Sequence, residues 1–317
     1  MTAMRPDSDP LALDQLPAFT ATDASVLAGL PGLVWPAWLA PERSWPGLCR
    51  ALSPLAVGDL AKDPAAAAAL IRRTLGARLP QQDGAHILRD MAAEGILTFL
   101  QVLKCHRPGG WAPPVRLSHS GRVAEALENG RGVILWVAHG FHGHLGAKVA
   151  FGQAGIKVTH LSRPDHGFSG SRFGTRYLNR IQTAVEDRYI AERVLLPMSG
   201  QNAALNLLAR RLRDNRVVTI TAQRGAARTA QAAFMDGAVT LAIGGPALAH
   251  MTGAALLPVF AFRDEEGVVD VRIEAPLELD RAAPRDQAVA DVVARYAPRL
   301  EAQVLRYPGQ WLGWVQL

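Results

Sequence analysis

The chain has 317 residues, of which 49% are hydrophobic, so it is long enough to bury one large core. Its two cysteines, Cys49 and Cys105, exclude a disulfide-based framework and are typical of a reducing compartment. No stretch holds the roughly 20 continuous apolar residues that a membrane-spanning helix needs, and the polar N-terminus lacks the order of a signal peptide. We therefore expect a cytoplasmic protein that is soluble or rests peripherally on the cytoplasmic face of the inner membrane.

The positive charge is concentrated in one segment. The net charge is +6 at pH 7, and residues 163–228 alone contain twelve arginines, no lysine and five acidic residues. Arginine clusters suit phosphate groups, whether on a lipid headgroup, a pantetheine carrier or a nucleic acid. A solvated, arginine-preferring surface is an equally open interpretation, since the whole chain has only four lysines. A nucleic-acid partner is not expected, because aromatic residues are sparse here and no reader motif is present.

The first part of the chain predicts a helical region over residues 1–106. Residues 17–75 have helical character in pieces, with expected breaks at Pro31, Pro36, Pro46 and Pro54. The apolar positions of residues 86–104 keep a helical period. The proline- and glycine-rich segment 107–114 is typical of a linker, and it separates this region from a second one at residues 115–317.

The second region alternates strands with helices, which predicts an α/β domain with a mostly parallel central sheet flanked by helices. The expected strands are 133–138, 157–161, 194–196, 217–221, 255–262 and 268–273. The expected helices are 120–129, 143–154, 173–183, 201–213, 245–252 and 285–305, the last interrupted by Pro298.

Three histidines, His139, His142 and His144, follow the first of these strands within six residues. Strand ends concentrate catalytic groups, because the backbone there holds a side chain rigidly where substrate still reaches it. His139 is placed to act as a general base toward a hydroxyl or an amine. Such a base usually has a partner on its other ring nitrogen, and His144, at the start of a helix, has the spacing to be that partner.

The same histidines raise the alternative of a zinc site, because imidazole is a common zinc ligand. The His-x-His-x-Asp-His pattern of metallo-β-lactamases does not fit, since Phe141 and Gly143 interrupt the cluster and it contains no Asp. We therefore assign no metal ligand and no cofactor to the chain.

Several motifs resemble, in order, those of the lysophospholipid acyltransferase superfamily, and most closely those of the late (lauroyl and myristoyl) acyltransferases of lipid A synthesis. The run GVILWVAH, ending at His139 and followed by a titratable residue at 144, resembles the superfamily's His-x4-Asp/Glu motif. The later motifs are Ser162-Arg163-Pro164, TAQRG at 221–225, FMDG at 234–237, GAALLPVF at 253–260 and RYPGQWL at 306–312. The resemblance covers about residues 85–317, and the C-terminal motif is the most specific.

This resemblance implies a glycerol-3-phosphate acyltransferase-like fold and transfer of an acyl group from acyl carrier protein or coenzyme A to a lipid or another hydroxyl or amine acceptor. It implies His139 as the base, oriented by the residue at 144, with no covalent acyl-enzyme. It also implies that Arg163 contacts polar groups of the donor or acceptor, and that Gln223 and Arg224 line the site. We place His142 among the substrate-binding residues as well.

The chain departs from the family at polar functional positions. His144 stands where the motif has Asp or Glu, Ala222 stands where the family has Asp, and GWVQL replaces the usual His-Arg-Arg tail. A neutral imidazole cannot stabilise an imidazolium as a carboxylate does, and losing such a partner can cost about four powers of ten in rate. These changes predict altered chemistry or substrate. The alternative is a repurposed or non-catalytic member that binds or condenses carrier-linked intermediates in a specialised metabolite pathway.

Overall fold

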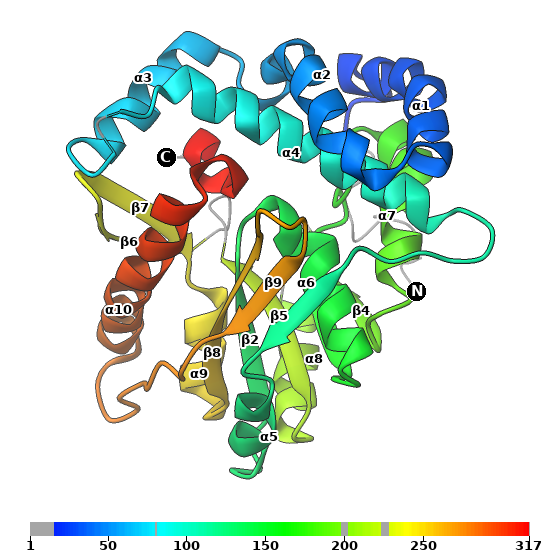
Figure 1. Cartoon of the computed structure of the whole chain (residues 1–317). Coiled ribbons are helices and arrows are strands. Elements are labelled where there is room, and N and C mark those ends of the chain that lie inside the picture. The colour runs from blue at the N-terminus through cyan, green and yellow to red at the C-terminus, as the bar shows by residue number, and fades with distance from the viewer. Residues whose placement is uncertain (1–15, 80, 198–201, 223–227, 317) are drawn as a thin grey trace, which may run out of the picture.

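The computed structural model describes residues 16–79, 81–197, 202–222 and 228–316. Its centre is a seven-stranded sheet in the order β1–β9–β8–β2–β5–β3–β4 (Figure 1). The strands are β1 Val115–Ser118, β2 Val133–Ala138, β3 Val158–Ser162, β4 Glu192–Leu195, β5 Val217–Ala222, β8 Ala255–Arg263 and β9 Val269–Ile273. All neighbours pair in parallel except β8 and β9, which are antiparallel. The mostly parallel α/β sheet predicted from the sequence is confirmed.

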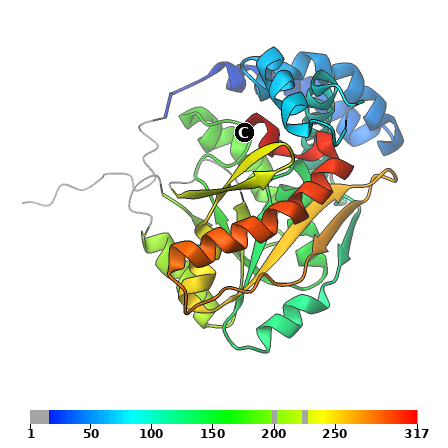
Figure 2. The same ribbon diagram turned by 90° about the vertical axis from the view of Figure 1, so that its left-hand side faces the viewer.

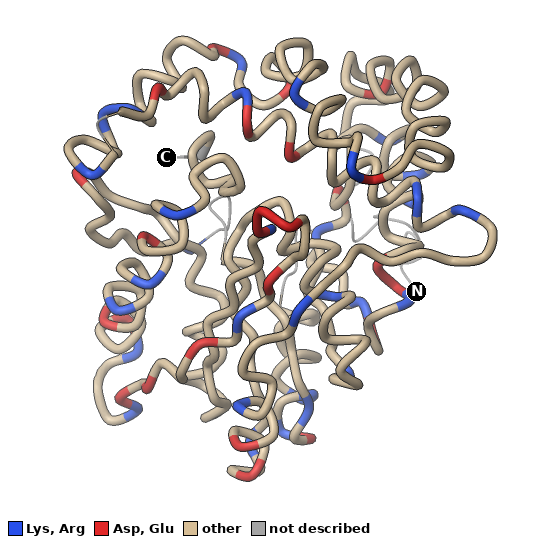
Figure 3. The backbone as a smooth tube through the Cα atoms, viewed as in Figure 1, with Lys and Arg blue, Asp and Glu red and all other residues tan. Residues whose placement is uncertain are grey.

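The middle of the sheet is covered on both faces, as parallel sheets require. All six residues of β2 are buried, and successive side chains alternate between two apolar clusters. Ile134 and Trp136 pack with helices α8, α9 and α10, whereas Val133 and Leu135 pack with α5 and α6. Figure 3 shows almost no charged residue along the central strands. This agrees with the continuous apolar runs in their sequences.

The helices that flank the sheet lie between its strands in the sequence or, in the case of α10, η4 and η5, follow the last strand. They are α5 Gly121–Leu127, α6 Phe141–Gln153, α7 Asn179–Glu186, α8 Asn202–Arg213, α9 Gly244–Thr252 and α10 Arg285–Arg306, with short helices η3 Gly174–Leu178, η4 Pro308–Gln310 and η5 Leu312–Gln316. The predicted interruption at Pro298 is wrong, because α10 runs through it. Burial of one face against the sheet and the β6–β7 hairpin stabilises this helix beyond the local cost of the proline.

The N-terminal helices lie above the carboxyl ends of the parallel strands (Figure 1). They are α1 Ala21–Leu39, η2 Glu42–Ser44, α2 Trp45–Leu60, α3 Pro64–Leu75 and α4 Gly84–Cys105. Three of the four predicted breaks at prolines are wrong, since Pro31 and Pro36 lie inside α1 and Pro54 lies inside α2. Pro46 occupies the first turn of α2, where the missing N–H has no helical partner to lose. Both helices pack on α4, and this packing outweighs the local proline penalty.

Apolar side chains of α3 and α4 join the same cluster as the sheet and α10, as Ile71, Met91 and Trp136 illustrate. The linker at 107–114 leads directly from α4 into β1. We keep the division into a helical region, residues 1–106, and an α/β region, residues 115–317, as a proposal about how the chain is organised.

Two features of the fold were not predicted. A hairpin of β6 Thr229–Phe234 and β7 Gly237–Ala242 forms a separate two-stranded sheet that lies against α10 (Figure 2). Five of the twelve residues in its strands are alanine, so the sequence gives them little strand signal. Strand β1 was also missed, because it is only four residues long.

Candidate active site

His139 lies directly beyond the carboxyl end of β2, where the C-terminal segment pairs with its backbone. The backbone N–H of Leu312 donates to the His139 carbonyl at 3.1 Å, and Gly140 pairs with Trp311 in a β-bridge. A side chain at Gly140 would meet the Gln310 carbonyl oxygen at 3.0 Å, so glycine permits this close approach. The C-terminal motif that resembles the family most closely therefore holds the backbone of the proposed base.

Helix α6 begins immediately after this loop, two residues earlier than predicted, with Gly140 as its N-cap. A Cβ at Gly143 would lie 2.8 Å from the Ala138 carbonyl oxygen, so the first turn of α6 packs directly on the end of β2. The rings of His139 and His144 come together across this contact, with centroids 5.7 Å apart and planes at 80°. His139 is 9% exposed. The structure thus places side by side the two histidines that the sequence paired.

A third imidazole extends this arrangement. The ring of His166, from the loop after β3, lies 5.1 Å from that of His144 and 6.4 Å from that of His160. Nε2 of His166 is 3.0 Å from each carboxylate oxygen of Glu186, which is fully buried on α7. His139, His144, His166 and Glu186 therefore form a continuous row that begins at the strand end and finishes at a buried carboxylate.

Other polar groups from three elements surround Glu186. Lys148 Nζ donates to its Oε2 at 2.7 Å, Arg193 Nη2 at 2.9 Å, and Gln182 donates to Oε1 at 2.8 Å. Burial alone would raise the pKa of Glu186, but the charges of Lys148 and His166 outweigh it and hold the pKa well below its usual range. Glu186 is therefore ionised at neutral pH.

The surroundings of His144 oppose its protonation. Burial lowers the pKa of His144 well below its usual value, and the nearby His166, His139 and Lys148 lower it further, against a smaller opposing effect of Glu186. His144 is therefore neutral at pH 7. It does not reproduce the negative charge of the motif's acid at this position.

His142 points away from this row and into a second buried network. Its Nε2 lies 2.9 Å from Glu94 Oε2, and the ring is 1% exposed. The guanidinium of Arg263, at the end of β8, hydrogen-bonds to both oxygens of Glu94. Burial alone would raise the pKa of Glu94, but His142 and Arg263 lower it to about 2. His142 thus anchors α6 to α4, and its assignment to substrate binding stays a prediction.

A cavity of about 270 Å³ opens on the far side of this network. Glu94, Arg263, Arg50 and Asp90 contribute charges of both signs to its wall. Gln310 also lines it and fixes Arg263 through two hydrogen bonds to the arginine backbone, at 2.7 and 2.8 Å. The cavity therefore adjoins the histidine motif through His142.

A sequence profile of the bacterial lipid A biosynthesis acyltransferases matches residues 103–316. The chain belongs to this family. It is also similar to the phosphatidylinositol mannoside acyltransferase of Mycolicibacterium smegmatis, with 33% identity over 119 residues. That match covers 37% of this chain and 37% of the relative, so it spans little more than a third of that protein's length. The resemblance drawn from the motifs is confirmed, and acyl transfer is supported as the general class of reaction.

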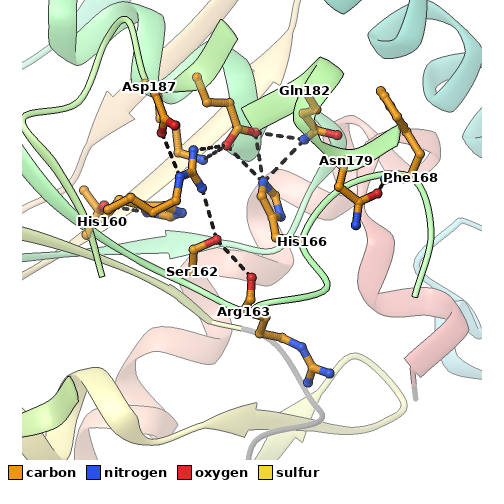
Figure 4. Close-up of polar contacts among 12 residues, drawn as sticks. His160, Ser162, Arg163, His166, Phe168, Asn179, Gln182 and Asp187 are labelled. Carbon is orange, nitrogen blue, oxygen red and sulfur yellow. Dashed lines mark hydrogen bonds and ion pairs between the residues drawn. The ribbon is translucent and has the colours of Figure 1, made fainter. Parts of the chain in front are cut away.

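The second motif of this lipid A acyltransferase family member carries Arg163 at the end of β3. Its guanidinium binds both oxygens of Asp165 at 2.9 Å, and this hydrogen bonding raises the pKa of Arg163. In Figure 4 the Arg163 side chain extends away from His166. Its proposed contact with donor or acceptor stays a prediction. Gln223 and Arg224 lie outside the described residues.

Sequence reasoning missed Glu94, His166 and Glu186. Glu94 had a detectable signal, since it lies three residues from both Met91 and Leu97 on the apolar face of the predicted helix. His166 had a weaker one, as it follows the second motif by two residues. Glu186 is one of several acidic residues in an arginine-rich segment, and nothing in its local sequence distinguishes it.

Among the residues described, no three His, Cys, Asp or Glu side chains are grouped so that they could hold a metal ion. Within the same ranges, every helix is too short or too polar to cross a membrane.

Proposed function

We propose that this chain transfers an acyl group from a carrier-protein or coenzyme A thioester to a hydroxyl or amine acceptor, with His139 as the general base. The observation that carries the proposal is the position of His139. It stands at the carboxyl end of β2, its backbone is held by the C-terminal motif, and its ring lies against His144. A base fixed in this way meets the geometric requirement for removing a proton from an incoming nucleophile.

The reaction follows from this arrangement. His139 takes the proton of the acceptor hydroxyl or amine, and the freed lone pair attacks the thioester carbonyl carbon. The tetrahedral intermediate then collapses, the C–S bond breaks, and His139 returns the proton to the departing thiolate. No covalent bond to the protein is formed, so one histidine serves as base and then as acid.

The first turn of α6 is placed to stabilise the charge that develops on the thioester oxygen. Helix N-terminal amides carry a partial positive charge and lack helical partners. Among the residues that the structure describes, no side chain caps these amides of α6. The Gly143 amide donates to the Gly140 carbonyl at 3.2 Å, and the bridge between Gly140 and Trp311 directs the Phe141 amide toward the C-terminal segment, so we assign the oxyanion contact to the amide of His142.

Around this centre we propose that Arg163, Gln223, Arg224 and His142 contact the polar parts of donor and acceptor. The arginine-rich segment suits a phosphate-bearing donor, as in a pantetheine carrier. A peripheral position on the cytoplasmic face of the inner membrane is part of the same proposal.

The test is thiol release from lauroyl-coenzyme A and lauroyl-acyl carrier protein in the presence of lysophospholipid, lipid A precursor and long-chain amine acceptors, with the product identified by mass spectrometry. We expect His139→Ala to lower kcat/KM by about 10²–10⁴-fold without lowering Tm, because a positioned base contributes that much. Unchanged product formation in this variant would exclude the general-base role.

A binding protein without turnover is the second candidate, and the neutral state of His144 favours it, since the motif's negative charge is absent there. It predicts that the wild-type chain binds the acyl carrier protein but releases no thiol with any acceptor. In that case His144→Glu, which restores the motif's carboxylate, separates a decayed enzyme that regains activity from a repurposed one that does not.

A further inference from the structure

We propose that the outer face of α1, together with a strip of arginines on the helix beside its N-terminal end, docks the protein on the surface of an anionic lipid bilayer. This docking surface deepens the proposed function, on which it rests, by naming the residues that bring the chain to a lipid acceptor. It uses an exposed apolar helix face and exposed charges that the candidate active site leaves unexplained.

Helix α1 is apolar on the side that faces solvent. Leu27, Pro31, Trp35 and Leu39 follow one another at intervals of four residues, so they share one face of the helix. All four are exposed, Trp35 to 67% and Leu39 to 70%. The opposite face, which includes the buried Ala37, packs on α4. A surface helix normally carries polar residues on its outer side, so an apolar outer face marks a contact with another apolar phase.

The outer face of α1 also carries no charge. Asp23 is the only ionisable residue in Ala21–Leu39, and it is fully buried. Its carboxylate accepts a hydrogen bond from the Ser171 hydroxyl at 2.9 Å, which ties α1 to the segment after β3. No charged group therefore has to be dehydrated when this face enters the boundary between lipid headgroups and acyl chains.

Aromatic side chains continue this face at the N-terminal end of α1. The ring of Phe19, directly before the helix, lies 5.3 Å from that of Phe173, which lies 5.1 Å from that of Tyr177. The Arg172 amide donates to the Pro17 carbonyl at 2.9 Å and holds the two segments together. Phe19 and Tyr177 are each about half exposed. Exposed aromatic rings beside an apolar helix face are typical of interfacial membrane contacts.

The arginine strip consists of Arg172, Arg176 and Arg180, which are spaced by four residues from just before η3 into α7 and are all exposed. Arg193, in the same arginine-rich segment, pairs with carboxylates, whereas no ion pair joins the strip to any residue that the structure describes. The guanidinium of Arg176 lies over the ring of Tyr177, 5.6 Å from its centroid. Exposed arginines beside an apolar face attract the phosphates of anionic lipids.

A second copy of this chain fits the surface less well than a bilayer does. A twofold interface pairs the same surface with itself, and neither the outer face of α1 nor the arginine strip contains an acidic residue. Such a pairing buries the apolar face but leaves the arginines without a counter-charge. A bilayer with anionic lipids supplies both an apolar interior and phosphates.

The surface lies at the end of the molecule that holds the candidate active site. Helix α1 lies above the carboxyl ends of the parallel strands, the end at which His139 follows β2 (Figure 1). Helix α7 exposes Arg180 on its outer side, and its buried Glu186 contacts His166, whose ring lies 5.1 Å from that of His144. A lipid held in the docked bilayer therefore approaches the end of the sheet at which the proposed base lies.

Flotation of the full chain with vesicles of phosphatidylglycerol and phosphatidylethanolamine tests the apolar part. We expect Trp35→Ser with Leu39→Ser to lower the vesicle partition coefficient by about tenfold or more, because both side chains lose their transfer out of water. The Tm should change little, since both side chains are exposed. Met251→Ser is the control, an exposed apolar residue on α9 near the amino end of β8, and it should stay within about twofold of wild type. Absence of wild-type binding, or an equal loss in the control, overturns the proposal.

The charged part is tested by changing the lipid. We expect Arg176→Gln with Arg180→Gln to weaken binding to the anionic vesicles by about fivefold for each arginine, and to leave binding to phosphatidylcholine vesicles unchanged. Arg210→Gln with Arg213→Gln, in the last turn of α8, removes the same charge elsewhere and is the control. If the strip variant binds both kinds of vesicle like wild type but releases less thiol from lauroyl-acyl carrier protein, the strip contacts the donor protein and its part of the proposal fails.

Phospholipids brominated on their acyl chains locate Trp35 directly. We expect these vesicles to quench part of the tryptophan emission of the wild type. Trp35→Phe, which keeps an aromatic ring on the face, should retain most of the vesicle binding and lose that part of the quenching. Equal quenching of the two proteins would contradict the insertion of α1.

The outcomes separate this inference from the proposed function, because vesicle binding needs neither donor nor turnover. Acyl transfer to lysophospholipid in detergent micelles without any vesicle binding would leave the proposed function standing and remove the docking surface. Vesicle binding through Trp35 and Leu39 in a chain whose His139→Ala variant is fully active would do the reverse. A dimer in light scattering that Trp35→Ser with Leu39→Ser disperses, without vesicle binding by the wild type, would assign the face to a second copy and overturn the proposal.

Discussion

Glu94 holds His142 with one carboxylate oxygen and Arg263 with both, so a single residue of α4 orients the start of α6 and the end of β8. We predict that Glu94→Gln lowers the free energy of unfolding by about 3 kcal/mol at pH 7, because it leaves the guanidinium of Arg263, whose side chain is only 18% exposed, without its counter-ion. Chemical denaturation of the purified variant measures this value. Asp90→Asn, on the same helix, is the control, since the pair of Asp90 with His86 is largely exposed and should contribute less than about 1 kcal/mol.

The wild-type chain should show the same contribution as it is acidified. The folded-state pKa of Glu94 is about 2 against an ordinary value of 4.5. A lowered carboxyl pKa stabilises the fold above pH 4.5, and this stabilisation is lost as the pH falls toward 2. Equal effects of Glu94→Gln and Asp90→Asn on stability would contradict this account of the network.

At the scale of elements, the contact between the first turn of α6 and the end of β2 decides how the two histidines meet. A methyl group at Gly143 would lie 2.8 Å from the Ala138 oxygen and 3.3 Å from Val137 Cγ1. We predict that Gly143→Ala destabilises the protein by about 1–3 kcal/mol, because the helix must move away from the strand. It should also lower kcat, since His139 and His144 flank this contact. Thermal unfolding and the thiol-release assay check the two effects.

Gly29→Ala provides the comparison for this change. Gly29 lies within α1, and an added Cβ would meet no described atom within 4 Å beyond its chain neighbours and the backbone of its own helix. Alanine in an open helix interior is expected to stabilise by about 0.5–1 kcal/mol. Opposite signs for the two substitutions would support the close approach as the cause, and a neutral result at Gly143 would argue against it.

The elements themselves were predictable where one physical signal dominated. Strand β2 was predicted with its observed bounds, because burial on both faces produces an uninterrupted apolar run that ends at His139. Prolines misled the prediction in α1, α2 and α10, since packing against neighbouring helices and strands is invisible in a local window. The β6–β7 hairpin was missed for a similar reason, as its alanine-rich strands depend on α10 for burial.

The residues of the candidate site also differ in whether a local sequence signal could predict them. His139 and His144 were paired correctly because their spacing across a strand end and a helix start is local. His166 and Glu186 join them only because β3 lies beside β5 in the sheet and the following helix α7 returns over α6. Strand order is a property of the whole chain, so the sequence predicted that His139 and His144 lie together but not that a buried carboxylate lies nearby.

At the scale of the whole molecule, two histidines that are neutral in the fold make its stability depend on mild acidification. Burial is the main cause that lowers the pKa of both His144 and His160 well below 6.5. The unfolded chain binds protons at these positions near pH 6.5, whereas the folded chain does not, so the free energy of unfolding falls as the pH drops below about 6.5. The slope is at most about 1.4 kcal/mol per pH unit for each histidine.

The buried carboxylates do not add to this loss of stability between pH 6.5 and 4.5. Glu94 and Glu186 have lowered pKa values, so their stabilisation is lost only below their ordinary value of 4.5. We therefore predict that His160→Asn, whose amide can still bond to the Thr219 hydroxyl, flattens the loss of stability between pH 6.5 and 4.5 by one histidine's share. Urea unfolding at half-unit pH steps measures the slope, with His250→Gln as the control, because the Nε2 of His250 lies 3.3 Å from the carbonyl oxygen of Ala283, well apart from this site in the sequence. Identical slopes for wild type and His160→Asn would mean that His160 gains its proton without unfolding, and that the acid sensitivity arises at His144 or elsewhere.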